Sequence, residues 1–152
     1  FEGAREGLKG YLGTSNELDF DEVSKILSEF KSGKPKIWLK RMGRTDCELW
    51  YSKVDFSNID ILIVEWTHGN SDHYQGVDIP ILLNSTPEET LAHRRKRNRD
   101  GKTDSPFTML ILEIEQSMLV KQAIKAKYIL SKSGEMLTYD AYREVMNENK
   151  KN

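Results

Sequence analysis

The chain has 152 residues, a size that suits one domain with a hydrophobic core of its own. Its 23 basic and 24 acidic side chains leave a net charge of −1, so no overall field favours nucleic acid or membrane lipid. The mean hydropathy is −0.63, no apolar run reaches the roughly 18 residues of a membrane span, and one cysteine cannot form an intrachain disulfide, so we expect a cytoplasmic protein.

The first 18 residues contain four glycines at short intervals, a composition that disfavours the interior of a helix or strand. We therefore predict a flexible glycine-rich loop over residues 1–18. Because the chain begins at Phe1 and not at methionine, we also expect that a segment upstream of it is missing.

Residues 19–32 carry apolar side chains at spacings of three and four, which predicts an amphipathic helix. Asp19 or Asp21 can cap its start, and Gly33 followed by Pro35 ends it.

Two short strands follow, at residues 36–41 and 48–54, joined by a polar connection. We predict a hairpin over residues 36–54 that carries Arg41, Arg44 and Tyr51.

The stretch from Ile59 to Val64 is nearly all aliphatic and rich in β-branched residues, which is typical of a strand buried on both faces of a parallel sheet. Glu65 and His68 follow this stretch directly. Ligands of open α/β sheets bind outside the carboxyl ends of the strands, so these two polar side chains are candidates for a functional site.

The second half of the chain continues the alternation of strands and helices. Residues 78–83 predict a second buried strand, and Ser85 or Thr86 can cap a helix that Pro87 begins. This helix turns strongly basic, with five cations between His93 and Arg99. A long helix over residues 107–125, a strand pair near residues 126–138 and a terminal helix complete the chain.

This order of elements resembles the P-loop kinase family of uridine kinases and phosphoribulokinase. Four stretches carry the resemblance: the helix ending at Lys36, the strand ending at Glu65, residues 78–88, and the basic run from Arg95 to Asp100. The resemblance implies a three-layer α/β domain with a parallel sheet and flanking helices, incomplete at its N-terminus. It also implies a single kinase-like domain over residues 1–152, with a substrate-side hairpin at 36–54 and a lid at 87–106.

The resemblance assigns a role to each candidate residue. Glu65 would hold Mg²⁺ beside ATP, and Arg95 and Arg99 would close over the transferred phosphate as part of the lid. Arg41, Arg44, Tyr51 and His68 would bind the acceptor, a small molecule with a hydroxyl group such as a nucleoside or phosphosugar. A capping or ion-paired carboxylate at Glu65, and a solvated basic helix face at 93–99, remain alternatives.

The sequence departs from the family at three points. Trp66 stands where the family has glycine, and Asn84 replaces an acid before the lid. No Gly-x-x-x-x-Gly-Lys-(Ser/Thr) motif occurs in the 152 residues, so the loop that would cradle the ATP phosphates is absent from this chain. We expect the chain alone to be inactive, as a fragment of a phosphotransferase.

A second hypothesis is a non-catalytic α/β module that binds an anion or a protein through its basic helix. Nucleic acid is disfavoured as a partner, and the oligomeric state, including a homo-oligomer, stays open.

Overall fold

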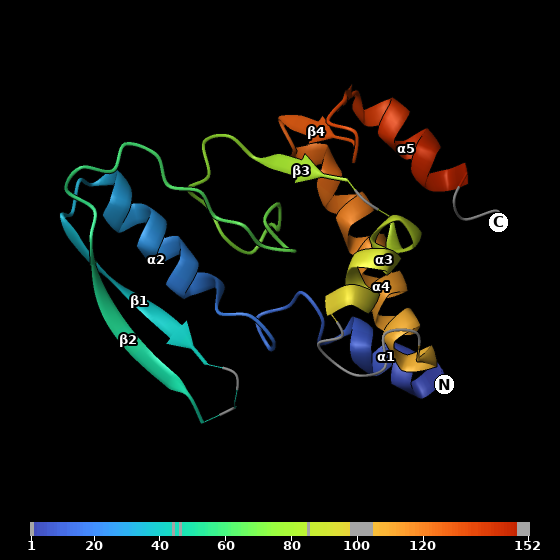
Figure 1. Ribbon diagram of the computed structural model, residues 1–152, viewed down its shortest axis with the longest axis horizontal. Helices are drawn as coiled ribbons and strands as arrows, with labels where there is room; N and C mark the ends of the chain where they lie inside the picture. The colour runs from blue at the N-terminus through green and yellow to red at the C-terminus, as the bar shows by residue number, and fades with distance from the viewer. Residues whose placement is uncertain (1, 44, 46, 85, 98–104, 149–152) are drawn as a thin grey trace. The chain divides into compact units, whose positions relative to one another are not determined.

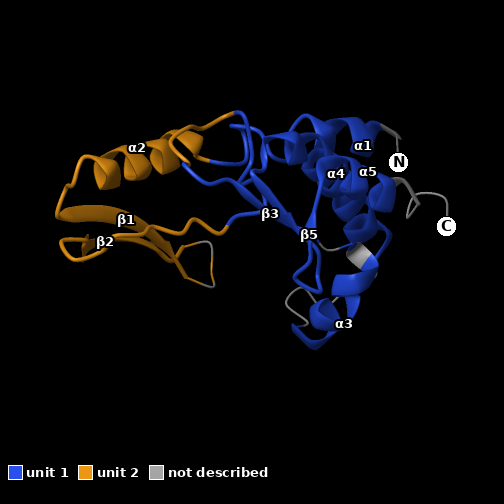
Figure 2. Cartoon of the chain, turned by 90° about the horizontal axis from the view of Figure 1, so that it is seen from above, with its two compact units in different colours: residues 1–18, 66–72, 78–152 blue, residues 19–65, 73–77 orange. Residues whose placement is uncertain are grey.

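The computed structural model describes residues 2–43, 45, 47–84, 86–97 and 105–148 (Figure 1). Contacts divide the chain into two compact units, coloured separately in Figure 2. Unit 1 comprises residues 1–18, 66–72 and 78–152, and unit 2 comprises residues 19–65 and 73–77. No helix among the described residues is long and apolar enough to cross a membrane.

Unit 2 begins with helix α2 (Phe20–Lys31), whose limits follow from its capping residues. The side chain of Asp19 accepts a hydrogen bond from the backbone N–H of Glu22, which satisfies one of the free donors at the start of the helix. Gly33 adopts a φ of +74°, and the N–H groups of Gly33 and Lys34 bond back to the carbonyls of Phe30 and Glu29. The chain thus leaves the helix through a Schellman turn, as the glycine in the sequence predicts.

Strands β1 (Lys36–Met42) and β2 (Leu49–Asp55) pair antiparallel along their whole length and form the hairpin expected from the sequence. Helix α2 packs against β1, and Ile37 is fully buried. Figure 2 shows α2 lying along one side of this two-stranded ribbon. Phe20 and Leu27 of the helix are also buried, as is Tyr74 from the short segment 73–77 that belongs to the same unit.

Unit 1 contains a small mixed sheet in the order β3-β4-β5. Strands β3 (Ile81–Leu83) and β4 (Tyr128–Leu130) are parallel, whereas β4 and β5 (Met136–Leu137) are antiparallel. Helix α4 (Pro106–Gln122) leads into the 3₁₀ turn η1 (Ala123–Lys125), and helix α5 (Tyr139–Glu148) ends the chain. One cluster of buried side chains joins the sheet to these helices: Leu82, Ala123, Ile129, Tyr142 and Met146.

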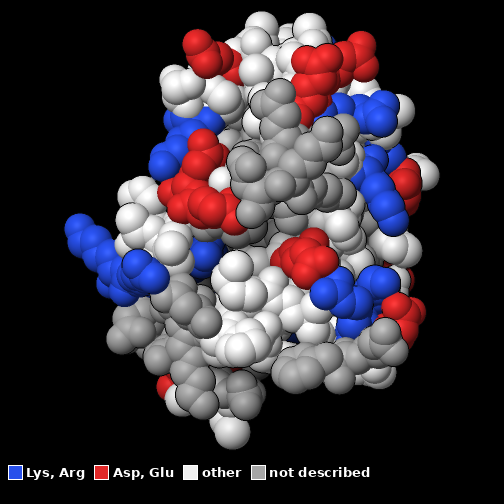
Figure 3. Space-filling view, turned by 90° about the vertical axis from the view of Figure 1, so that its right-hand side faces the viewer, with Lys and Arg blue, Asp and Glu red and all other residues white. Residues whose placement is uncertain are grey.

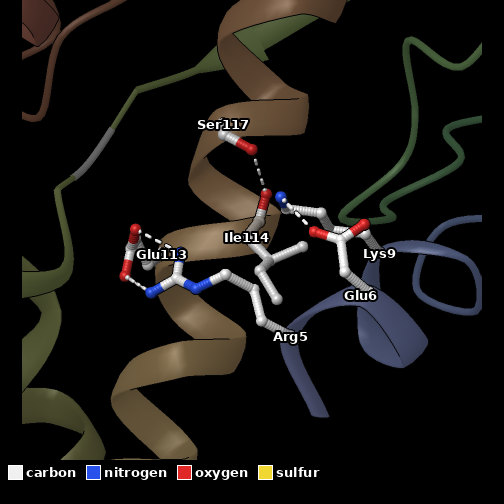
Figure 4. Close-up of polar contacts among 6 residues, drawn as sticks. All are labelled: Arg5, Glu6, Lys9, Glu113, Ile114 and Ser117. Atoms are coloured by element: carbon white, nitrogen blue, oxygen red, sulfur yellow. Dashed lines mark hydrogen bonds and ion pairs between the residues drawn. The ribbon is translucent and has the colours of Figure 1, made fainter. Parts of the chain in front are cut away.

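The prediction of a flexible loop over residues 1–18 is wrong for the helix α1 (Glu2–Lys9). A second buried cluster explains this, because Leu12 packs with Leu110 and Ile114 of α4 and Leu8 lies against them. Arg5 adds a two-bond contact to the carboxylate of Glu113, at 2.8 and 3.0 Å (Figure 4). Tertiary packing of this kind routinely outweighs the low helix propensity of glycine.

The prediction of a buried central strand at residues 59–65 is also wrong for this structure, which assigns no strand there. The side chains of Ile61 and Ile63 are 76% and 83% exposed, while Leu62 and Val64 between them are half-buried. A strand is completed by hydrogen bonds to a neighbour, and in unit 2 the described pairing joins β1 and β2 alone. The side chains of this stretch therefore alternate between exposed and half-buried, as in a strand, but no described strand is hydrogen-bonded to it.

The observed fold is thus an α/β arrangement with two small sheets and five α-helices over the described residues. The basic segment forms α3 (Pro87–Arg97). Thr86 and Glu89 exchange hydrogen bonds in a capping box, with the Thr86 N–H donating to the Glu89 carboxylate at 2.8 Å. The remainder of the expected lid, residues 98–104, lies outside the described residues.

Replacing Gly7 with alanine should stabilise the protein by about 0.5–1 kcal/mol, because a Cβ at this helical position meets no atom within 4 Å. Chemical denaturation monitored by circular dichroism measures the change.

Leu12→Ala should destabilise the protein by about 2–5 kcal/mol, since Leu12 is buried against α4. If both substitutions left the denaturation midpoint unchanged, residues 2–12 would be the loose loop that the glycines predict.

Candidate functional site

Glu65 ends the extended aliphatic stretch of unit 2, and its side chain is exposed. Its carboxylate is therefore open to solvent and to a ligand. Mg²⁺ typically takes one or two protein carboxylates and fills its other positions with water and phosphate oxygens. Among the described residues no three His, Cys, Asp or Glu side chains converge as a metal cluster.

His68 lies in unit 1 and is buried, with 3% of its surface exposed. Its ring packs directly under Gly13, where an added Cβ would approach the imidazole Cε1 to 2.7 Å. Gly13 adopts a φ of +67°, a conformation that glycine tolerates best. The backbone N–H of Gly13 donates to the Glu17 carboxylate at 2.6 Å, which fixes the turn above the histidine.

The negative charge of Glu17 acts on two titratable groups of unit 1 around this turn. Burial lowers the pKa of His68, and the negative charge of Glu17 partly opposes that effect. Burial also raises the pKa of Glu115, and the charge of Glu17 raises it further. The imidazole is therefore held neutral, and its Nδ1 atom has no hydrogen-bond partner among the described residues. In this position the His68 ring packs against the turn at Gly13.

Arg95 is exposed on the last turn of α3, where three further cations follow or precede it. Cations at this end of a helix complement the partial negative charge of the free carbonyl groups. Arg99 lies outside the described residues. In the view of Figure 3, basic and acidic side chains are interspersed and do not form a field of one sign.

The hairpin separates two residues that the sequence analysis assigned to one acceptor site. Directly opposed residues of an antiparallel pair lie on the same face, and Arg41 opposes Trp50 whereas Tyr51 opposes Lys40. Arg41 and Tyr51 therefore point to opposite faces of the ribbon. The Arg41 guanidinium donates to the Ser52 hydroxyl at 2.9 Å, and Arg44 lies outside the described residues.

The candidate residues are thus distributed over both units. Glu65, Arg41 and Tyr51 belong to unit 2, and His68 and Arg95 belong to unit 1. Each unit is described by itself. Their assignment to a common catalytic site stays a prediction from the sequence.

Sequence reasoning missed the side chains that accompany Tyr51 on its face of the hairpin. Trp38 lies one row away and is 54% exposed, and Lys40 and Lys53 lie directly opposite Tyr51 and Trp38. The signal was present in the first strand, where Trp38 and its two neighbouring lysines alternate with the apolar Ile37 and Leu39. Strand register was needed to show that they share a face.

Comparison with known proteins identifies a similar stretch in one much longer protein. Over 133 residues the chain is 46% identical to the bifunctional alpha-galactosidase/sucrose kinase AgaSK of Mediterraneibacter gnavus. The match covers 88% of this chain and 14% of that protein, so the chain spans a small part of its relative. No family model matches the chain, and no solved structure matches it.

Gly13→Ala in unit 1 should lower the free energy of unfolding more than Gly33→Ala in unit 2 does. Both glycines have a positive φ, but a Cβ at Gly33 meets nothing within 4 Å whereas one at Gly13 overlaps the His68 ring. The strain common to both should cost about 1 kcal/mol or more, and the steric overlap should add about 1–3 kcal/mol at Gly13. Urea denaturation of the two variants gives the difference. Equal losses would show that His68 does not pack under Gly13.

His68 should make stability depend on pH. Because its pKa is lowered in the folded state, the unfolded chain binds the extra proton as the pH falls below about 6.5. The contribution of His68 is thus fully present above that pH and is lost as the pH decreases toward the folded-state pKa. His68→Gln should remove this slope, and unfolding free energies measured from pH 5 to 7.5 for both proteins test it. Parallel pH profiles would contradict the buried neutral imidazole.

Proposed function

We propose that this chain is part of an ATP-dependent phosphotransferase that acts on a sugar hydroxyl. The observation that carries the proposal is the 46% identity, over most of the chain, to a stretch of a protein named for a sucrose kinase activity. The P-loop kinase resemblance of the sequence, which rests on the order of Glu65, the capped helix α3 and its basic end, favours the same activity.

In this proposal Glu65 holds Mg²⁺, which neutralises charge on the nucleotide phosphates. Arg95 and Arg99 stabilise the charge that spreads over the transferred phosphoryl group. Arg41, Arg44, Tyr51 and His68 were assigned to the acceptor from the sequence. The structure supports an accessible Tyr51, whereas the burial of His68 under Gly13 favours a structural role for that histidine.

ATP itself requires a phosphate-binding loop. The motif that supplies it in P-loop enzymes does not occur among the 152 residues. The proposal therefore assigns nucleotide phosphate binding to residues outside this stretch, and this chain alone is inactive. Micromolar binding of Mg-ATP to the 152 residues, measured by isothermal titration calorimetry, would refute this assignment.

Glu65→Gln in the complete polypeptide that contains this stretch should lower kcat by about 10²-fold or more, because the amide is a much weaker ligand for Mg²⁺. Transfer of labelled phosphate from ATP to sucrose measures the rate. Asp60→Asn is the matched control, since Asp60 is an exposed acid of the same extended segment and should leave kcat unchanged.

The outcome also separates the two hypotheses about the chain. Phosphate transfer that is lost in Glu65→Gln and retained in Asp60→Asn supports the enzyme. Absence of transfer by the complete polypeptide, together with anion binding that is lost when Arg95 is replaced, would identify the non-catalytic module instead.

A further inference from the structure

One face of the β1–β2 hairpin is covered by helix α2, and the other face carries an unusual set of side chains. The register places eight residues on the second face, which we call the exposed hairpin face: Lys36, Trp38, Lys40 and Met42 from β1, and Leu49, Tyr51, Lys53 and Asp55 from β2. All eight are exposed to solvent.

The two aromatic rings on this face each have a lysine directly opposite on the other strand. Trp38 opposes Lys53, whose Nζ lies 5.7 Å from the indole centroid, and Tyr51 opposes Lys40 in the next row. Adjacent rows on one face of a strand are roughly 7 Å apart. The face thus presents two neighbouring rows, each with an aromatic residue opposite a lysine. The aromatic residue comes from β1 in one row and from β2 in the other.

The opposite face of the same hairpin packs against helix α2. Ile37 is buried there against α2, and Val54 and Ser52 are half-buried. Packing of the hairpin within unit 2 therefore does not require Trp38 or Tyr51. Large aromatic side chains that stand open on a flat surface are characteristic of binding surfaces.

The charge of this face restricts what it can bind. It carries three lysines and one acid, and Asp55 stays ionised because a hydrogen bond from Ser57 lowers its pKa. Among the described residues neither an ion pair nor a hydrogen bond engages Lys40. The net positive charge complements an anionic group, and the rings complement a ligand with a flat apolar surface.

We propose that the exposed hairpin face binds a sugar that carries a phosphate group, the product class of the proposed reaction. The C–H face of the sugar ring stacks on Trp38, and the phosphate binds the ammonium groups of Lys40 and Lys53. This inference rests on the proposed function for its choice of a sugar, and on register, exposure and charge for its location.

The hairpin contains its own matched control. Trp50 is 51% exposed and lies on the opposite face from Trp38. Both tryptophans are therefore open to solvent on the same ribbon, and replacing either with alanine should leave unit 2 folded. A ligand on the exposed hairpin face distinguishes the two residues, whereas a general effect on the hairpin does not.

The test is a titration of the 152-residue chain with a sucrose monophosphate, followed by the indole N–H signals in NMR spectra. We expect the Trp38 signal to shift while the Trp50 signal stays in place. Trp38→Ala should raise Kd about tenfold, the effect of losing one stacking contact, and Trp50→Ala should leave Kd unchanged. Lys40→Met should weaken binding of the sucrose monophosphate and leave binding of sucrose unaltered.

Two further titrations define the ligand. Weaker binding of sucrose and of inorganic phosphate than of the sucrose monophosphate supports a combined site, and equal binding of inorganic phosphate would overturn the role of the rings. Equal losses in Trp38→Ala and Trp50→Ala, no binding, or shifts confined to residues 59–68 would overturn the proposal. The transfer assay with the complete polypeptide tests the proposed function separately. If the complete polypeptide phosphorylates sucrose but Trp38→Ala binds the sucrose monophosphate normally, the kinase proposal stands and the binding site on the exposed hairpin face is wrong.

Discussion

Unit 1 depends on one long helix that packs at both ends. The N-terminal half of α4 contributes Leu110 and Ile114 to the cluster that holds Leu12. Val120 near its other end, and Ala123 of the following turn η1, pack with the sheet and α5. The burial of these apolar side chains is the dominant favourable term for so small a sheet, because β3 and β4 pair over three residues only. The Arg5–Glu113 contact, which is exposed, orients α1 on this helix but does not drive its docking.

The extent to which an element depends on packing with distant residues explains whether it could be predicted from the sequence. Helix α2 has a complete local signal, with an apolar face, an Asp19 cap and a Gly33 stop, and it forms close to the predicted limits. Helix α1 has the opposite local signal, since three of its flanking and internal positions are glycine, and it forms because Leu8 and Leu12 meet α4. A contact between residues about 100 positions apart leaves no trace in local composition.

The stretch from Ile59 to Val64 shows the opposite kind of error, because the sequence predicts a strand that the structure does not assign there. Its composition favours a strand strongly, but composition determines only which side chains suit a sheet, and the hydrogen bonds must come from a neighbour. Exposed Ile61 and Ile63 alternate with half-buried Leu62 and Val64, which is the period that the side chains of a strand would have. Local composition does not show whether another strand will lie beside it.

For the candidate site, residue types were easier to predict than directions. Glu65 is exposed, whereas His68, three positions later, is buried beneath a glycine that no motif connects with it. Arg41 and Tyr51 were grouped because both lie on the hairpin, and register then placed them on opposite faces. A shift of one position along a strand reverses the face of a side chain, so Trp38 and Tyr51 share a surface while Trp50, adjacent to Tyr51, does not. Whether a residue is at an odd or an even position along the strand therefore decides which face of the hairpin its side chain lies on. This difference makes Trp38 a candidate ligand contact and Trp50 its control.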